Sequence, residues 1–361
     1  MRDFTTDRSF SFRSICLIMA SGNPPMWRQI MKQRKLGNEG PAVSEIALGA
    51  MGMSGLYGPS DREENIATVH AALDAGINLI DTGDFYGMGR NEMLLGEALK
   101  SRQRDDFLVS VKFGAQRAPD GNWIGYDASP NALKTALSYS LSRLGLDHID
   151  IYRPARLDPK VPIEETVGAI AELIEAGYVR YLGLSEVGPE TIRRAAAVHP
   201  VTDLQIEYSL MSRGMEEAIL PVARELGIGI TAYGVLSRGL LSGNWSPERQ
   251  LDPTDFRAHA PRFQGKNLKR NLELTEQLRA IADEKDSTVA QLAIAWVLSR
   301  GEDIVPLVGA RRRDRLAEAL GGSDLDLDVD TLSRIEASIP EESVAGTRYP
   351  EPQMGTLDSE R

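Results

Sequence analysis

The amino-acid sequence predicts an α/β protein with the architecture of a closed (β/α)8 TIM barrel. From residue 44 onward, short runs of β-forming residues alternate with helical patterns, and the strand–helix unit repeats eight times. Glycines follow several helical patterns, and polar residues end the apolar runs. Eight consecutive units favour a closed parallel barrel over an open sheet.

The predicted strands are short apolar runs at residues 46–49, 78–81, 107–112, 149–152, 181–184, 203–206, 229–233 and 304–308. Residues able to bind a ligand fall at or just after their carboxyl ends, namely Asp81, Lys112, Ser185, Gln205, Tyr233 and Gly309. In a barrel these ends carry the active site, so we expect the six residues to lie together.

The predicted helices cover residues 63–75, 92–100, 130–144, 163–176, 189–198, 216–226, 272–284, 289–299 and 311–320. Gly76, Gly145, Gly177 and Gly227 each follow a helical pattern, where a left-handed cap favours glycine. A doubly wound nucleotide-binding sheet is the alternative architecture, and it requires a Gly-x-Gly-x-x-Gly turn. The glycines after the first predicted strand do not have that spacing.

The composition favours a protein that acts on small molecules. The chain has 361 residues, 42% of them hydrophobic, so it can bury a large core as one domain or two. A formal net charge of −11 argues against binding nucleic acids or anionic membranes, and no apolar run is long enough to span a bilayer. The single cysteine, Cys16, argues against a disulfide or a cysteine metal site and favours a cytoplasmic location.

The two ends of the chain differ from its middle. Residues 1–30 are interpreted as a disordered extension, or as an upstream start with Met31 as the alternative; a targeting peptide is the competing interpretation. Residues 31–345 are expected to form the barrel, and residues 346–361 a flexible C-terminal tail.

Asp81, Tyr86 and Lys112 outline a proton-transfer site at two neighbouring strand ends. A phenol with a pKa of about 10 is a poor acid at neutral pH, but a nearby ammonium fixed by a carboxylate lowers that pKa. Taken alone, the Asp-Thr-Gly segment at 81–83 is also typical of a turn that caps a helix.

Four arginines open the last predicted helix: Arg311, Arg312, Arg313 and Arg315. The helix macrodipole disfavours cations there, so their clustering indicates an anionic ligand. A 2′-phosphate is the natural candidate because it matches the arginine fork; a solvated basic face is the alternative.

Several longer motifs accompany these features, including Asp81-Thr-Gly-Asp-Phe-Tyr86-Gly, Gly183-Leu-Ser-Glu186, Leu204-Gln-Ile-Glu-Tyr208 and Ala232-Tyr-Gly-Val-Leu-Ser-Arg-Gly-Leu-Leu-Ser-Gly243. As a set they resemble the aldo-keto reductase superfamily, especially its bacterial and fungal branch, over about residues 35–339. The resemblance implies a (β/α)8 barrel that binds NADPH and transfers hydride between the nicotinamide and a carbonyl.

Residue by residue, the resemblance implies that Tyr86 is the proton donor, tuned by Lys112 and Asp81. It also implies a set of cofactor contacts, in which Tyr233 stacks on the nicotinamide and Ser185 and Gln205 bind its carboxamide. The other implied contacts are Met51, Asp81, Gly234, Leu236, Arg238, Gly239, Gly309, Arg311, Arg315 and Glu318. Glu186 and Ala319 depart from the family's pattern, which has Asn at these positions.

The implied substrate contacts are Tyr57, Phe85, Trp123, Ala155 and Arg156. Ala155 occupies the position of the family's catalytic histidine, which opens space beside Tyr86; Arg153 or Arg156 can compensate for the lost donor. The aromatic residues, with Tyr126, suit a bulky or polycyclic ketone such as a toxin keto intermediate. The long loop 242–270, with Trp245, Phe256 and Phe263, can cover cofactor or substrate.

Two functions are consistent with these residues. The first is an NADPH-dependent reductase of a small-molecule carbonyl substrate, active as a monomer or weak homo-oligomer without a metal. The second is a regulatory protein that binds NADPH as a sensed ligand with little turnover. Ala155 favours the sensor, whereas Asp81, Tyr86 and Lys112 favour the enzyme.

Overall fold

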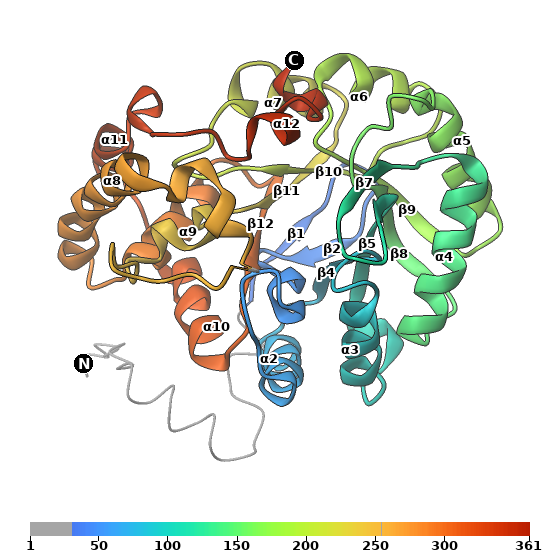
Figure 1. Cartoon of the computed structure of the whole chain (residues 1–361), viewed down its shortest axis with the longest axis horizontal. Helices are drawn as coiled ribbons and strands as arrows, with labels where there is room; N and C mark the ends of the chain where they lie inside the picture. The colour runs from blue at the N-terminus through green and yellow to red at the C-terminus, as the bar shows by residue number, and fades with distance from the viewer. Residues whose placement is uncertain (1–30, 254) are drawn as a thin grey trace, which may run out of the picture.

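The computed structural model describes residues 31–253 and 255–361, so the predicted extension at 1–30 lies outside the described residues. Eight parallel strands close into a barrel surrounded by helices (Figure 1), which confirms the predicted architecture. In barrel order the strands are β3 (Ala47–Gly49), β4 (Leu79–Gly83), β5 (Leu108–Phe113), β8 (Ile149–Pro154), β9 (Val179–Ser185), β10 (Asp203–Glu207), β11 (Gly229–Tyr233) and β12 (Ile304–Gly309).

The outer helices follow the strands in chain order. They are α2 (Arg62–Asp74), α3 (Arg90–Leu99), α4 (Pro130–Leu144), α5 (Ile163–Glu175), α6 (Pro189–Ala196), α7 (Met215–Glu225), α8 (Gly265–Glu284), α9 (Val289–Ser299) and α10 (Arg313–Leu320). Two helices that the sequence analysis did not predict come after them, α11 (Val329–Ser338) and the short α12 (Glu351–Met354). Within the described part of the chain, no helix has both the length and the apolar character needed to cross a membrane.

Several strands run further than the sequence pattern predicts. The pattern ends β4 at Asp81 and β5 at Lys112, yet Thr82 and Gly83 still pair with β5, and Phe113 of β5 pairs with β8. The apolar pattern stops early because the upper interior of the barrel is polar, so buried Asp81 and Lys112 replace aliphatic side chains there.

The amino-terminal end of the barrel is apolar. The hairpin of β1 (Gln33–Lys35) and β2 (Ala42–Ser44) contributes Val43 to a small buried cluster with Leu79, Ile151 and Val305 of the barrel strands. A larger core fills the space between the strands and the helices. Bulky aliphatic side chains therefore fill this end, and polar chemistry is confined to the other one.

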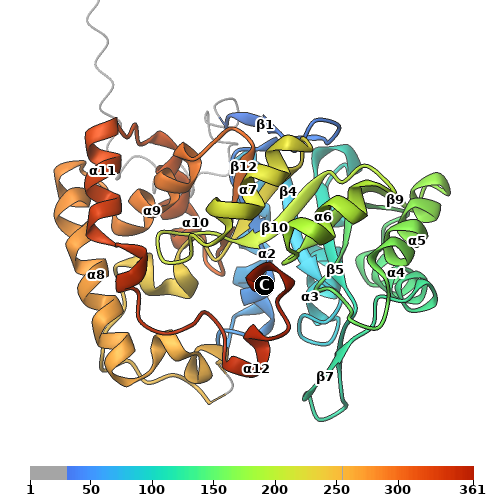
Figure 2. The ribbon, with the colours of Figure 1, turned by 90° about the horizontal axis from the view of Figure 1, so that it is seen from above.

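Two additional segments border the carboxyl end of the barrel. One is the hairpin of β6 (Ala115–Arg117) and β7 (Trp123–Tyr126), and the other is the C-terminal segment 346–361 with α12; Figure 2 shows α12 and β7 on the same side of the molecule.

The C-terminal segment differs from the flexible tail that the sequence analysis predicted. Arg348 and Leu357 are buried, and the Asp358 carboxylate accepts a hydrogen bond from the backbone N–H of Gly188 at 2.8 Å. The prediction was wrong because polar side chains of this segment form hydrogen bonds and ion pairs with the barrel, whereas the prediction assumed that they are solvated.

Candidate active site

Asp81 lies at the centre of a buried polar cluster. Its carboxylate forms an ion pair with Lys112 of the next strand, and the two side chains are only 3% and 5% exposed. It also accepts hydrogen bonds from Ser110 Oγ and Gln205 Nε2, both at 2.8 Å. Three groups from two other strands thus satisfy this carboxylate, and Lys112 has a fixed position.

A second buried ion pair lies beside the first. Arg153 donates to Asp203 at 2.9 Å and to Ser110 Oγ at 2.8 Å, and both charged side chains are fully buried. Arg153 is therefore part of the barrel interior and cannot replace a substrate contact, contrary to one expectation from the sequence.

Tyr86 follows β4 and is buried against the edge of the Phe85 ring, with the two ring centroids 4.8 Å apart. The Lys112 ammonium lies 5.2 Å from the centroid of the Tyr86 ring. Tyr86 and the Lys112–Asp81 pair are therefore neighbours, as the sequence analysis predicted.

The electrostatics differ from the expectation that Lys112 lowers the pKa of Tyr86. Burial raises the pKa of Tyr86 well above its ordinary value, and the Asp81 charge adds to the effect. Burial also lowers the pKa of Lys112 to about 8, although Asp81 opposes that shift. Because the lysine charge is compensated by Asp81, it does not dominate the field at the phenol, and Tyr86 stays protonated at neutral pH.

A cavity of about 530 Å³ opens above this cluster. Its lining includes the predicted catalytic residues Asp81, Tyr86 and Lys112 and every predicted cofactor residue. Of the predicted substrate residues, Tyr57, Phe85, Trp123 and Arg156 line it. The volume falls within the range of roughly 300–1,000 Å³ that is typical of small-molecule sites.

Comparison with known proteins identifies the family. A model described as "Aldo/keto reductase family" matches residues 45–340. The chain belongs to the aldo/keto reductase family. It is 42% identical over 318 residues to "Probable aldo-keto reductase 1" of Glycine max, covering 87% of this chain and 91% of that protein. It is 38% identical over 321 residues to "Aldo-keto reductase yakc [NADP(+)]" of Schizosaccharomyces pombe, covering 88% and 94%.

Solved structures of aldo/keto reductases share the fold. A glycerol dehydrogenase from Gluconobacter oxydans superposes with a TM-score of 0.78 at 29% identity, covering 86% of this chain and 96% of that one. The holo form of an aldo-keto reductase from Bacillus halodurans gives 0.71 at 28% identity, covering 86% and 97%. The chain is therefore an oxidoreductase of the family that acts on carbonyl compounds.

Ala155 does not lie where the sequence analysis expected it. It is 2% exposed and is not among the residues that line the cavity. Its backbone N–H donates to the Phe113 carbonyl at 2.8 Å, and its own carbonyl accepts from Arg156 at 2.6 Å. Ala155 is therefore buried outside the lining, and its neighbour Arg156 lines the cavity.

The arginine cluster is divided between the cavity and the outer surface. Helix α10 begins at Arg313, two residues later than predicted, and Arg313 pairs with Glu64 of α2 at 2.9 Å. Arg311, Arg312 and Arg315 line the cavity. Among the described residues, Arg311 donates to the backbone carbonyls of Tyr57, Gly58 and Pro59, at 3.0, 3.2 and 3.1 Å.

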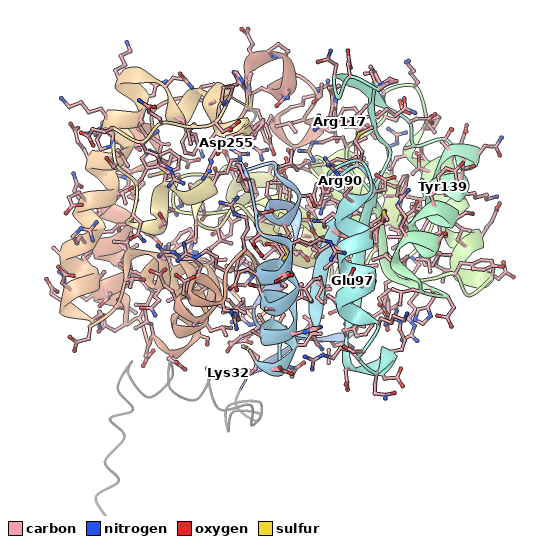
Figure 3. All side chains as sticks on the ribbon, turned by 60° about the horizontal axis from the view of Figure 1, so that its bottom comes forward. Lys32, Arg90, Glu97, Arg117, Tyr139 and Asp255 are labelled. Carbon is pink, nitrogen blue, oxygen red and sulfur yellow. The ribbon has the colours of Figure 1, made fainter. Side chains whose placement is uncertain are left out.

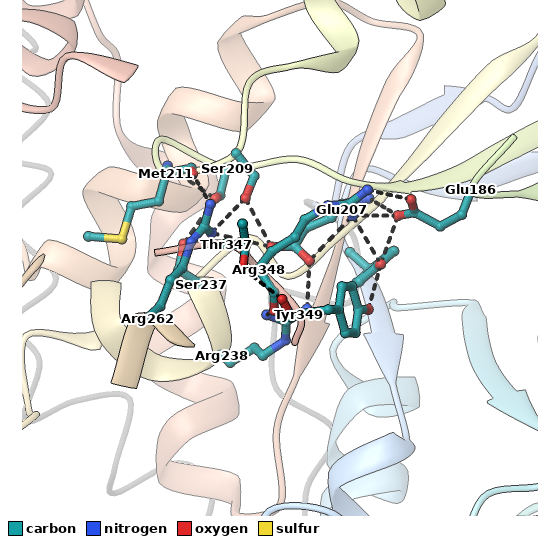
Figure 4. A network of polar contacts seen from close by, with 12 residues as sticks. Glu186, Glu207, Ser209, Met211, Ser237, Arg238, Arg262, Thr347, Arg348 and Tyr349 are labelled. Carbon is teal, nitrogen blue, oxygen red and sulfur yellow. Dashed lines mark hydrogen bonds and ion pairs between the residues drawn. The ribbon is translucent and has the colours of Figure 1, made fainter. Parts of the chain in front are cut away.

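Glu186 is the centre of a second polar cluster (Figure 4). It is fully buried, and its φ of 54° lies in the left-handed region that Asn adopts more readily than Glu. Its carboxylate accepts hydrogen bonds from both terminal nitrogens of Arg348, at 2.8 and 2.6 Å, and from Tyr233 OH at 2.7 Å. Burial disfavours the charge, yet Arg348 holds the pKa of Glu186 well below its ordinary value.

Arg238 belongs to the same network. It pairs with Glu207 at 2.7 Å, donates to the Arg348 carbonyl at 2.5 Å, and lies 4.4 Å from the centroid of the Tyr349 ring. Tyr349 in turn hydrogen-bonds Tyr233 OH at 2.9 Å. Arg238, which the resemblance implies as a cofactor contact, thus lines the cavity with Glu207 as its counter-charge.

The sequence analysis missed the cavity residues of the C-terminal segment: Tyr349, Gln353, Thr356 and Leu357. No local pattern marks them, because the segment lies outside the strand–helix repeat. The predicted loop contributes Trp245 and Phe256 to the lining, whereas Phe263 is buried behind Trp245 with their rings 4.9 Å apart.

Proposed function

We propose that this aldo/keto reductase is NADPH-dependent and reduces an aldehyde or ketone to the alcohol, with Tyr86 as the proton donor. The observation that carries the proposal is the juxtaposition of Tyr86 with the buried Lys112–Asp81 pair in the floor of the cavity. A protonated phenol next to a fixed cation is suited to general acid catalysis.

Two features of the cavity support NADPH as the cofactor. Ser185 Oγ is buried in the lining and has no hydrogen-bond partner among the described residues, so it is free to bind a carboxamide. Arg311 has no carboxylate partner among them either, and its fork suits a phosphate. The NADP(+) named for the Schizosaccharomyces pombe relative agrees with this assignment.

When bound, NADPH supplies a hydride to the carbonyl carbon. Tyr86 OH donates a hydrogen bond to the carbonyl oxygen and transfers its proton as negative charge develops there. Lys112 stabilises the phenolate that remains, and Asp81 keeps the ammonium in place. Burial of this cluster excludes water and strengthens each of these interactions.

The substrate side of the cavity is aromatic. The Trp123 ring lies edge-on to Phe85 at 6.0 Å and to Tyr126 at 5.2 Å, measured between centroids. These rings stand at 89° and 72° to one another and offer apolar faces and edges near Tyr86, so we propose a bulky, flat carbonyl compound as the substrate.

The test of the activity is NADPH consumption with a panel of aromatic aldehydes and bulky ketones. We expect turnover of several members of the panel. Tight NADPH binding without turnover of any member would contradict the reductase and support the NADPH-sensing alternative.

The cofactor assignment predicts a selective effect of one arginine. Arg311→Ala is expected to weaken NADPH binding by about 10–100-fold and NADH binding by less than about threefold, because only NADPH carries the 2′-phosphate. Arg313→Ala is the matched control, since Arg313 pairs with Glu64 away from the cavity. Fluorescence titration measures both affinities, and equal losses for the two cofactors would contradict the placement.

A further inference from the structure

The cavity is strongly cationic, although the whole chain carries a net charge of −11. Nine lysine or arginine side chains line it, against the two carboxylates of Asp81 and Glu318. A cleft lined by one sign of charge attracts ligands of the opposite sign. This cavity is therefore built for anionic ligands.

Four of the lining arginines have no carboxylate partner within residues 31–253 and 255–361: Arg117, Arg156, Arg249 and Arg311. The other lining cations are paired, as Arg238 is with Glu207 and Arg257 with Asp255. Burial lowers the pKa of Arg117, Arg249 and Arg311, so an anion beside these three side chains would favour their charged form. Burial also opposes the charge of Arg156, but the surrounding tyrosines and the Glu186 carboxylate hold its pKa above the ordinary value.

The unpaired arginines form two groups. Arg249 and Arg311 lie near Arg257. Burial lowers the pKa of both side chains, and the positive charge of Arg257 lowers it further. The proposed function places the cofactor phosphates there. Arg156 and Arg117 belong to the aromatic side, where Arg156 contacts Tyr349 and Arg117 lies 5.1 Å from the centroid of the Trp123 ring.

The proposed cofactor phosphates lie beside the first group, so no ligand is yet assigned to the second group. Arg156 is partly buried, and the nitrogen that faces the cavity residue Tyr349 has only a weak hydrogen bond, 3.3 Å to the neutral phenol. A carboxylate accepts hydrogen bonds from an arginine fork much more strongly than a phenol does. Arg117 lies on the hairpin at the rim, where it donates to the Gly121 carbonyl and keeps further donors free (Figure 3).

We infer that the substrate is an anionic carbonyl compound, a flat ring that carries a carboxylate, and that Arg156 binds this carboxylate. The ring lies along Phe85 and Trp123 with its carbonyl at Tyr86, and Arg117 adds positive charge at the entrance. This inference rests on the proposed reductase function, which it deepens by naming the substrate class.

The test compares 4-formylbenzoate with its methyl ester, which keeps the ring and the aldehyde and removes the charge. For the wild-type protein we expect kcat/KM for the acid to exceed that for the ester by at least about tenfold. Arg156→Gln should lower kcat/KM for the acid by about 10–100-fold more than for the ester, whose smaller loss reflects the effect of the Arg156 charge on Tyr86. Arg156→Lys should retain part of the preference.

Arg90→Gln is the matched control, because it removes the same charge from an exposed side chain. Arg90 lies at the start of α3, outside the cavity lining (Figure 3). We expect it to leave both substrates unaffected. Equal kcat/KM for acid and ester in the wild type, or an equal loss on both in Arg156→Gln, would overturn the inference.

A binding measurement separates this inference from the proposed function. Calorimetry with the NADP+-loaded protein compares 4-(hydroxymethyl)benzoate with its methyl ester. Preference for the acid that Arg156→Gln removes, without turnover of either aldehyde, would refute the reductase and leave the anion site standing. Turnover of both aldehydes without any preference for the charged form would refute the anion site alone.

Discussion

Asp81 and Glu186 are two buried carboxylates just inside or just after the carboxyl ends of barrel strands, and each forms an ion pair. The partner of Asp81 is Lys112, 31 residues away on the adjacent strand. The partner of Glu186 is Arg348, 162 residues away in the C-terminal segment. The first pair is part of the barrel repeat, whereas the second connects the barrel to a segment outside that repeat.

The difference shows which contacts a strand pattern can predict. Asp81 is directly opposite Ser110, and Gly83 is opposite Lys112. The register of β4 and β5 therefore brings the side chains of Asp81, Ser110 and Lys112 together. No register relates Glu186 to Arg348. The proposed catalytic cluster is therefore positioned by the barrel strands, whereas the residues around Tyr233 are positioned by the packing of segment 346–361.

The first prediction removes the cation of the catalytic pair. Lys112→Met should lower kcat by roughly 10³-fold, because it removes the charge that stabilises the Tyr86 phenolate. NADPH affinity should change by only a few fold. Single-turnover rates and cofactor titration measure the two effects, and near-normal turnover would show that Asp81 and Tyr86 suffice without the ammonium.

The second prediction removes the cation of the distal pair. Arg348→Met should lower the free energy of unfolding by about 3–5 kcal/mol, because it leaves the buried Glu186 carboxylate without a counter-charge. Arg194→Met is the control: its pair with Glu164 is 46% and 41% exposed and should contribute less than about 1 kcal/mol. Urea unfolding measures the free energy of unfolding of both variants. Equal decreases for the two would contradict the stabilising role assigned to the Arg348–Glu186 ion pair.

The third prediction concerns pH and has a smaller effect. The pKa of Lys112 is lowered to about 8 from 10.5, so kcat/KM for reduction should fall about tenfold per pH unit above pH 8. Between pH 8 and 10.5, Lys112 is deprotonated in the folded state and still protonated in the unfolded state. The contribution of Lys112 to the free energy of unfolding should therefore rise between pH 8 and 10.5. A pH–rate profile that stays level through this window would contradict the role of the protonated lysine.

The sequence predicts the parts of the molecule that follow the strand–helix repeat. All eight barrel strands were predicted, and Tyr86, Lys112, Ser185 and Gln205 line one cavity because strand ends converge. The prediction ended β4 two residues early, since Thr82 and Gly83 give no apolar strand signal, and it ended β5 one residue early, at the charged Lys112.

The remaining differences arise from tertiary packing. Ala155 was expected in the substrate site from its place in a motif, but the residue is buried outside the cavity lining. The contribution of Tyr349 depends on where residues 346–361 dock, which no periodicity encodes. The contacts of Arg238 with Glu207 and Tyr349 likewise join segments that no periodicity relates.

The central claim is that Tyr86 donates the proton in an NADPH-dependent reduction, and Tyr86→Phe tests it most directly. The substitution removes one hydroxyl and keeps the ring that packs against Phe85. Cofactor titration and single-turnover oxidation of bound NADPH should be measured on the same preparation. We predict an NADPH affinity within a few fold of the wild type and no detectable reduction of a carbonyl that the wild type reduces. Turnover at a rate comparable to that of the wild type would contradict the account and assign the proton to another group.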